Sequence, residues 1–350
     1  MDFTPTPEQA AAQDLAARIF GDLSTPDRLA AAGSASDAEL WKALCAAGLP
    51  GAVEEVGLLG LVQLLEEQGR TTAQVPFAVS CVYGLLAVTA HGSADQRARL
   101  LPGLRDGTEV ATGAFPARGG GGGGQVRVEG DRLSGTVAWV PWLRDATVVL
   151  VAAADRSLWL VRPADARCEP VELTAPWRAG RLVLDGVRGE RLGDTGAAAV
   201  AYDDVLATAR TAFAGLQVGV CEGSLTRAVA YTNEREQFGR PLAAKQAVQL
   251  RAADAYMDTE AIRVTAYEAA WRRDEGLPYG THALTAAWWA SEAGRRVVHA
   301  GQHLHGGVGA DVEFPVHRHF LWGRQLDAYL GCGGEVLAEL GDLIATEESV

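Results

Sequence analysis

The spacing of apolar residues predicts helices over residues 5–105. One stripe of leucines recurs at helical intervals: Leu40, Leu44 and Leu49. Residues 54–68 continue the same pattern. Ser36, which precedes the acidic Asp37, is expected to cap the helix that carries the leucine stripe. The first part of the chain is therefore predicted to be helical.

From residue 108 to about residue 193 the pattern changes to short apolar runs separated by Gly, Asp and Pro, which is typical of strands and hairpins. Four runs are expected to be strands: residues 125–128, 133–140, 147–153 and 158–161. Their connections are too short for helical crossovers, so antiparallel pairing is expected. Six glycines at 119–124 could offer backbone N–H groups to a phosphate, but no Lys-Ser/Thr pair of a P-loop follows them.

Helical spacing returns at about Ala197. Five apolar residues recur at intervals of three and four and predict a stripe buried against other helices: Leu250, Ala253, Met257, Ala261 and Val264. The sequence DEGLP at 274–278 breaks this helix, and Thr281 is expected to cap a second long helix that runs through His299. The chain thus divides into three predicted domains, helical over 1–107, β over 108–195 and helical over 196–350.

Composition narrows the class of protein. The 350 residues are 48% hydrophobic, which is ample for a core, and 44 acidic against 31 basic side chains repel polyanions, so a nucleic-acid partner is not expected. The longest apolar run, residues 146–154, is far shorter than the roughly 18 residues of a membrane span, so no membrane partner is expected either. The five scattered cysteines contain no CxxC pair and indicate reduced thiols in a cytoplasmic protein.

Two clusters have the residue types of an anion site. The first is REQFGRP at 235–241, followed by Lys245 and Gln246, where Arg235 could grip a phosphate bidentately. The second is QHLHGGVG at 302–309, where glycine lets the backbone approach a ligand closely. Each cluster also has an ordinary structural interpretation, a surface salt-bridge set for the arginine and a helix cap with a turn for the glycines.

Five of the seven histidines crowd into the C-terminal region between His299 and His319. No cysteine lies among them, and only Asp311 and Glu313 supply nearby carboxylates, so a metal site is not predicted. A hydrogen bond from His303 or His305 near a phosphate is the preferred interpretation.

Taken together, the two clusters resemble the two signatures of the acyl-CoA dehydrogenase family, in the right order and spacing. The runs that carry the resemblance are REQFGRPLAAKQAVQLRAADAYMD and HLHGGVGADVEFPVHR. The resemblance covers nearly the whole chain. It implies an α+β multidomain fold with an N-terminal helical domain, a middle antiparallel β-barrel domain and a C-terminal four-helix bundle.

The resemblance also implies FAD as cofactor and a hetero- or homo-oligomer, a dimer or a tetramer, that acts on an acyl-CoA or acyl-carrier thioester. The family pattern then assigns the pyrophosphate and adenine half of a neighbouring subunit's FAD to Arg235, Gln237 and Phe238, with Gln246 in the same signature. Gly306, Gly307 and Gly309 match the glycine pattern; at the position where the family usually has a glutamine stands His303, with Gln302 beside it.

In the β domain, Trp139 matches the aromatic residue that the family places near the isoalloxazine. Pro141 stands where a threonine is usual, and proline has no N–H to donate to the flavin. The family's flavin loop corresponds to residues 115–118 and the glycine run, and no Ser or Asp follows it.

The carboxylate that should remove the α-proton is missing from both positions where the family carries it. One position, 24 residues after Gly306, is Leu330, and the other, 26 residues before Arg235, is Ala209. One interpretation is a base-lacking partner in a heteromeric complex, like the paired actinobacterial subunits that resemble those of steroid side-chain degradation. A second is an active flavoenzyme with a relocated base, the candidates being Asp203, Asp204, Glu222 and Asp327. A third is a non-redox protein that binds an acyl thioester or serves as a scaffold.

Overall fold

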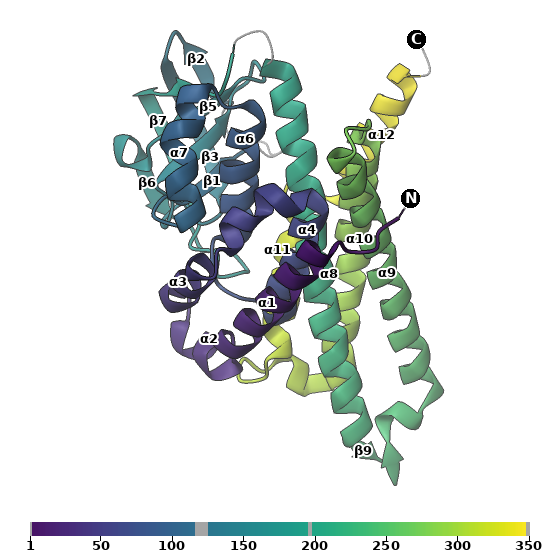
Figure 1. The fold of residues 1–350 in the computed structure, drawn as a ribbon. Helices are drawn as coiled ribbons and strands as arrows, with labels where there is room; N and C mark the ends of the chain where they lie inside the picture. The colour runs from purple at the N-terminus through teal and green to yellow at the C-terminus, as the bar shows by residue number, and fades with distance from the viewer. Residues whose placement is uncertain (1, 116–124, 195–197, 348–350) are drawn as a thin grey trace.

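The computed structural model describes residues 2–115, 125–194 and 198–347. Its N-terminal part is helical, and α4 runs through its centre (Figure 1). The helices are α1 (Pro7–Leu23), α2 (Pro26–Ala32), α3 (Ala38–Ala46), α4 (Leu49–Thr71), α5 (Phe77–Val79), a π-helical turn at Ser80–Leu86, α6 (Ala87–His91) and α7 (Ala94–Asp106). The leucine stripe is buried as predicted, because α3 packs onto α1 and α4.

The expected cap of α3 is wrong by one residue. Asp37, not Ser36, caps the helix, and its Oδ1 accepts a hydrogen bond from the backbone N–H of Leu40 at 3.0 Å. Ser36 instead donates its hydroxyl to Asp145 in the β domain. Sequence spacing alone does not distinguish two adjacent capping residues, because both types accept this hydrogen bond.

Helix α4 changes direction at Gly57, whose φ of 72° lies in the region that favours glycine. The N–H groups of Leu58 and Leu59 that the kink frees are each 2.9 Å from a carboxylate oxygen of Asp274, at the end of α9. A remote carboxylate thus caps the second half of α4, where a local side chain would normally do so.

The β domain contains two four-stranded sheets. The first has the order β1 (Ala111–Ala114), β4 (Val148–Ala152), β5 (Leu158–Val161) and β8 (Glu190–Arg191). The second has the order β2 (Arg127–Glu129), β3 (Arg132–Val140), β7 (Gly180–Arg188) and β6 (Arg167–Pro170). All pairs but one are antiparallel, as expected. β1 and β4 are parallel, which is possible because the chain passes through β2 and β3 of the other sheet between them.

The C-terminal part contains long helices: α8 (Ala198–Glu234), α9 (Gln246–Asp274), α10 (Gly280–His305), α11 (Val316–Ala328) and α12 (Gly333–Glu347). A short hairpin of β9 (Glu236–Gln237) and β10 (Arg240–Pro241) joins α8 to α9 and projects beyond the bundle (Figure 1). Two expected helix ends are wrong. Thr281 lies inside α10, whose N-cap position is Tyr279, and the helix continues past His299 until Gly306 takes a positive φ and ends it.

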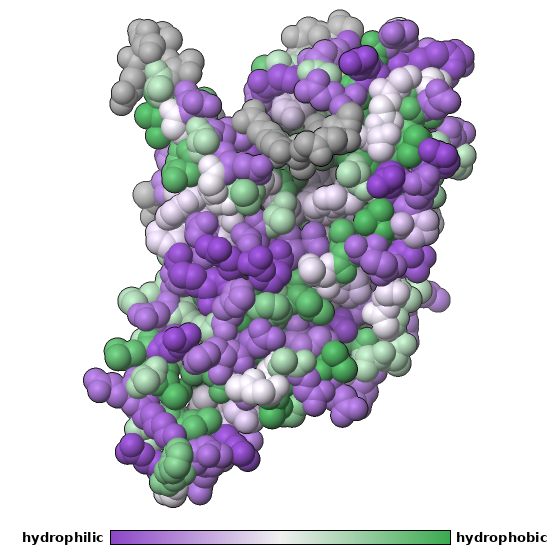
Figure 2. Space-filling view, turned by 180° about the vertical axis from the view of Figure 1, so that it is seen from behind, coloured by the Kyte–Doolittle hydropathy of each residue, from purple (hydrophilic) through white to green (hydrophobic). Residues whose placement is uncertain are grey.

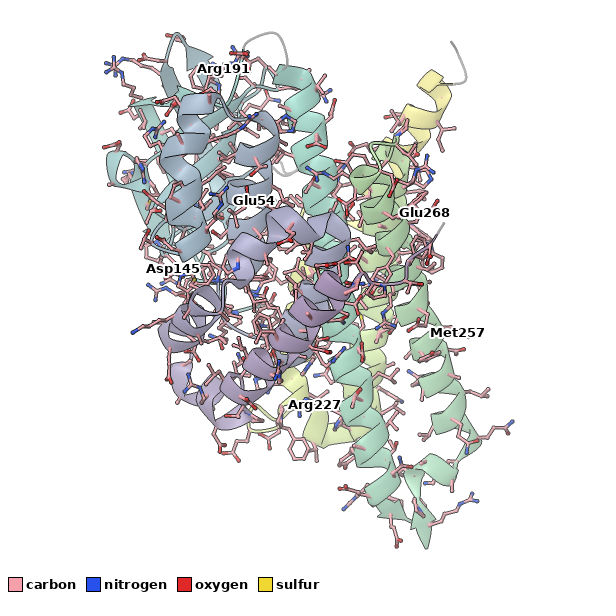
Figure 3. The ribbon with its side chains drawn as sticks, viewed as in Figure 1. Glu54, Asp145, Arg191, Arg227, Met257 and Glu268 are labelled. Carbon is pink, nitrogen blue, oxygen red and sulfur yellow. The ribbon has the colours of Figure 1, made fainter. Side chains whose placement is uncertain are left out.

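The predicted burial of the α9 stripe is also wrong. In the chain alone, 58% of Leu250, 61% of Met257 and 53% of Val264 is exposed. The buried face consists mainly of small residues, among them Ala255, Thr259 and Ala266. These let α9 approach α8 and α10 closely, so the larger apolar side chains point outward. Figure 3 shows Met257 on the outer side of α9.

Apolar side chains are interleaved with polar ones toward the lower end of the molecule, where α8 ends and α9 begins (Figure 2). Among the described residues no single helix is long and apolar enough to cross a membrane. Helices α3 and α4, which meet at 75°, reach the length and apolar composition of a membrane span only when they are taken together, and α4 is largely buried inside the protein.

Candidate functional site

The residues at the usual base position are packed into an aromatic cluster. Tyr329 follows α11 and Tyr83 lies on the π-helical turn, and their hydroxyl oxygens are 2.7 Å apart. The Tyr83 ring is buried and the Tyr329 ring is partly buried. Desolvation raises the pKa of both phenols far above the usual value, so both stay protonated. The hydrogen bond ties the N-terminal helices to the position of the missing base.

Tyr329 also contacts the strand that should face a flavin. Its ring centroid lies 5.5 Å from that of Trp139 and 4.5 Å from that of Phe213. A third aromatic ring stacked between two others needs about 7 Å between the outer ring planes. The rings of Trp139 and Tyr329 are therefore in direct contact, with no third ring between them.

Leu330 is held in the left-handed region, with a φ of 64°. Its carbonyl oxygen accepts hydrogen bonds of 3.4 Å from the guanidinium of Arg210, which also forms a 2.7 Å ion pair with Glu339 on α12. The side chain of Arg210 is 6% exposed, and Ala209 beside it is fully buried. An arginine thus adjoins both usual base positions. No motif in the sequence pointed to Arg210 or Glu339.

A small cavity remains at this point. It measures about 20 Å³ and is lined by Arg210, Gln217, Tyr329 and Leu330 among others. That volume holds about one water molecule and is far too small for an acyl thioester. Both amide atoms of Gln217 are buried with no protein partner in the described part of the chain, which suits a bound water.

Asp204, a candidate for a relocated base, is held by three partners. His91 Nε2 lies 2.7 Å from one carboxylate oxygen, the Tyr279 hydroxyl donates to the other at 2.6 Å, and Arg273 is 3.4 Å away. Burial by itself would raise the pKa of Asp204, but the hydrogen bond from His91 and the charge of Arg273 outweigh burial and hold the pKa well below its usual range. A carboxylate with so low a pKa is a weak proton acceptor.

The other three candidate carboxylates are also paired. Asp327 accepts a 2.6 Å hydrogen bond from Ser291 and forms a 3.0 Å ion pair with Arg324. Asp203 is an exposed partner of Arg156. Glu222 lies between two arginines, Arg70 and Arg263, on the far side of α8. The structure brings none of the three into the aromatic cluster around Tyr329.

The arginine signature forms the exposed hairpin. Phe238 is 92% exposed, has a φ of 57°, and lies under the ammonium of Lys245 at 4.9 Å. Gln237 pairs with Arg240 across the hairpin, and Gln246 begins α9. Within the described ranges the guanidinium of Arg235 makes no ion pair, so the salt-bridge set with Glu234 and Glu236 is not formed. An exposed aromatic ring and an unpaired arginine are both open to a ligand.

The glycine signature ends α10 and forms a 3₁₀ turn at Gly306–Ala310. Nothing lies within 4 Å of where a Cβ would stand on Gly306 or Gly307, so both are open to solvent. Packing requires a glycine at position 309, because a Cβ there would lie 2.4 Å from the carbonyl oxygen of Gln302. The side chain of Gln302 bonds to Gly309 at 3.4 Å, whereas His303 is exposed.

The C-terminal histidines are used for packing. His305 stacks on Tyr231 at 4.8 Å, His299 packs edge-on against Phe320, and His319 lies 2.9 Å from the carbonyl of Arg70. In the described part of the chain no three His, Cys, Asp or Glu side chains are placed to hold a metal ion.

The predicted site residues therefore fall into two separate groups. One group lies around Trp139 and Leu330, next to the aromatic cluster, and the flavin loop expected beyond Phe115 together with the glycine run lies outside the described residues. The other group comprises the hairpin and the glycine turn and is open. The exposed hairpin and glycine turn have the residue types of an anion site, and the rings of Trp139 and Tyr329 are in contact.

Comparison with known proteins agrees with this architecture. Residues 6–108 match the model of the acyl-CoA dehydrogenase N-terminal domain, and residues 196–339 match that of the C-terminal domain. The chain is 34% identical over 384 residues to the acyl-CoA dehydrogenase FadE27 of Mycobacterium tuberculosis, with 99% of each chain covered.

Two solved structures share the whole fold. The steroid acyl-CoA dehydrogenase Tcur3481-Tcur3483, in a G363A variant, superimposes with a TM-score of 0.91 at 43% identity and covers 98% of this chain and 99% of its own. The ChsE4-ChsE5 complex of M. tuberculosis gives a TM-score of 0.89 at 32% identity and covers 99% of each chain.

The chain belongs to the acyl-CoA dehydrogenase family. The predicted fold is confirmed, as is the actinobacterial type of the resemblance. FAD is the cofactor of this family of flavoprotein oxidoreductases, in agreement with the prediction.

Proposed function

We propose that this chain is the base-lacking partner subunit of a heteromeric acyl-CoA dehydrogenase that performs FAD-linked α,β-desaturation of an acyl thioester. The observation that carries the proposal is the contact of Tyr329 with Tyr83 and Trp139. In the proposed subunit these rings occupy the space of this chain's own flavin ring and thioester, and the exposed hairpin and glycine turn serve the partner's cofactor.

The reaction requires a carboxylate that takes the α-proton of the thioester, and bound FAD supplies the acceptor for the hydride from the β-carbon. In the proposed complex the partner subunit provides that carboxylate. This chain contributes the guanidinium of Arg235, the ring of Phe238, the side chain of Gln237 and the backbone of the glycine turn, which hold the pyrophosphate and adenine end.

The exposed stripe on α9 supports an oligomer. Leu250, Met257 and Val264 project from one helix face into solvent in the chain alone. Large apolar side chains aligned in this way mark a protein interface more often than an isolated surface. Both similar solved structures carry the names of two components.

The name of one of these structures describes a steroid acyl-CoA dehydrogenase, so a thioester with a bulky steroid-derived acyl chain is the substrate class that we propose. The carrier of the thioester is coenzyme A or an acyl carrier protein. The alternative of a relocated base has less support, because the four candidate carboxylates are all hydrogen-bonded or ion-paired.

The proposal is tested by producing the chain alone and together with an acyl-CoA dehydrogenase subunit encoded beside it. We expect the pair to be yellow and to bleach anaerobically with acyl-CoA, and the chain alone to hold little flavin. Arg235→Gln in this chain should lower the flavin content of the pair. Bleaching of the chain alone would refute the partner role, and flavin-free preparations of both kinds would favour a non-redox protein.

A further inference from the structure

Arg227 on α8 is a half-buried arginine for which the described residues provide no hydrogen-bond acceptor, carboxylate or aromatic partner. Burial is the sole cause of a lowered pKa at this guanidinium. Other arginines with similar burial are paired: Arg263 contacts three glutamates, and Arg273 contacts Asp204. A charge removed from water without compensation is costly, so such a group commonly has a ligand.

Arg227 lies near both exposed features, the hairpin at residues 235–241 and the glycine turn at Gly306–Ala310. Arg227, Tyr231 and Arg235 follow one another at intervals of four residues, so they lie along one side of α8 and its end. Tyr231 stacks on His305, the residue directly before the glycine turn, with 4.8 Å between ring centroids. Arg227 therefore flanks the same surface as Gly306 and Gly307, toward the lower end of α8 (Figure 3).

The described side chains that pack near Arg227 include two neutral imidazoles and one further arginine. His305 is buried and its Nδ1 donates to the carbonyl of Gly301 at 2.7 Å; burial lowers its pKa. Burial also lowers the pKa of His319, to about 4, so both imidazoles are neutral at pH 7. Arg318 on α11 bonds to the neutral side chains of Thr72 and Gln74. Among the described residues, neither Arg227 nor Arg318 forms an ion pair with a carboxylate.

We propose that Arg227 binds the pyrophosphate of an adenosine diphosphate group and forms, with Arg235, a two-arginine clamp on either side of Tyr231. The two arginines are eight residues apart, about 12 Å along the helix axis. The proposal rests on the proposed function for the presence of such a group. Both FAD and coenzyme A carry an adenosine diphosphate, so both are tested as its source.

The experiment uses the two-subunit complex and compares Arg227→Gln with Arg97→Gln, an exposed arginine on α7 that has no partner in the described residues. The dissociation constant of FAD is measured by flavin fluorescence and that of coenzyme A by calorimetry. We expect Arg227→Gln to weaken one of them about tenfold or more, because a charge-assisted hydrogen bond is lost, and Arg97→Gln to change neither. Weaker FAD binding identifies the flavin, and weaker coenzyme A binding identifies the thioester.

A stability measurement separates a binding role from a structural one. Arg227→Met removes an uncompensated half-buried charge, so the thermal midpoint of the chain alone should rise by about 2 °C while the ligand binds more weakly. If Arg227→Gln leaves both dissociation constants within about twofold of the parent, or Arg227→Met lowers the midpoint, the proposal is wrong. Arg235→Gln, measured in parallel, tests the proposed function separately. If Arg235→Gln loses flavin and Arg227→Gln does not, the proposed partner role stands and the proposed role of Arg227 is wrong.

Discussion

The hydroxyl groups of Tyr83 and Tyr329 lie 2.7 Å apart, and Tyr329 directly precedes Leu330, the residue at one expected base position. The contact joins the π-helical turn of the N-terminal helices to the segment that carries Leu330. The missing carboxylate and the tyrosine contact thus lie in one segment of the chain, and this is the basis of the proposed partner role.

The tyrosine pair gives a first prediction. Tyr83→Phe leaves the buried hydroxyl of Tyr329 without its partner and should lower the free energy of unfolding by about 1–2 kcal/mol, whereas the double change Tyr83→Phe with Tyr329→Phe should recover most of the loss. Urea denaturation measures both, with Tyr256→Phe as an exposed control. If the losses of the two single variants simply add in the double variant, the hydrogen bond does not contribute.

A second prediction concerns pH. Burial raises the pKa of Glu66 to about 7, despite the nearby charge of Arg263. The folded state therefore holds a proton that the unfolded state releases near its ordinary pKa of 4.5, so stability contributed by Glu66 is present below pH 4.5 and is lost as the pH rises to 7. Glu66→Gln should remove this dependence. Between pH 4.5 and pH 8 the free energy of unfolding of the parent should fall by about 3 kcal/mol more than that of Glu66→Gln.

The control for Glu66 is Glu55→Gln, which changes the same type of residue at a nearby position on α4. Unfolding curves at pH 5, 6, 7 and 8 provide the measurement. If the parent and Glu66→Gln lose stability in parallel between pH 5 and pH 8, the buried carboxyl does not titrate in this range.

The outward stripe of α9 provides a third prediction. Met257→Glu places a charge among exposed apolar residues, so it should weaken subunit association at least tenfold while the helix content of the chain stays unchanged. Light scattering after size exclusion and circular dichroism measure the two effects. Val200→Glu, at a similarly exposed position near the start of α8, is the matched control. An assembly that survives Met257→Glu at micromolar concentration would place the interface elsewhere.

A fourth prediction tests the remote cap. Asp274→Ala removes the acceptor of the N–H groups of Leu58 and Leu59, and we expect a loss of about 1–2 kcal/mol, similar to removal of a helix cap. Asp37→Ala, which removes the ordinary cap of α3, gives the reference value. Thermal unfolding compares the two, and hydrogen exchange at Leu58 and Leu59 should increase in Asp274→Ala only. Unchanged exchange there would contradict the role of Asp274.

Local patterns were sufficient for part of the fold. The four expected strands appear as β2 to β5, shifted by no more than two residues at their ends, because alternation and turn residues act within a few positions. Helix faces were harder to predict. The α9 stripe was assigned to the core because it holds the larger apolar residues, but alanine and threonine allow closer helix packing, and in the single chain they occupy the buried side.

The sequence by itself determined that Leu330 and Ala209 cannot accept a proton, since that follows from residue type, and that Arg235 and the glycines at 306–309 belong to signatures with the spacing of a dinucleotide site. Only the tertiary structure decided that Tyr329 meets Tyr83 and Trp139, that Arg210 and Glu339 adjoin the position of Leu330, and that Arg227 has no counter-ion among the described residues. These relationships join residues up to 246 positions apart, and contacts of that kind are set by how helices and sheets pack together, which no local pattern encodes.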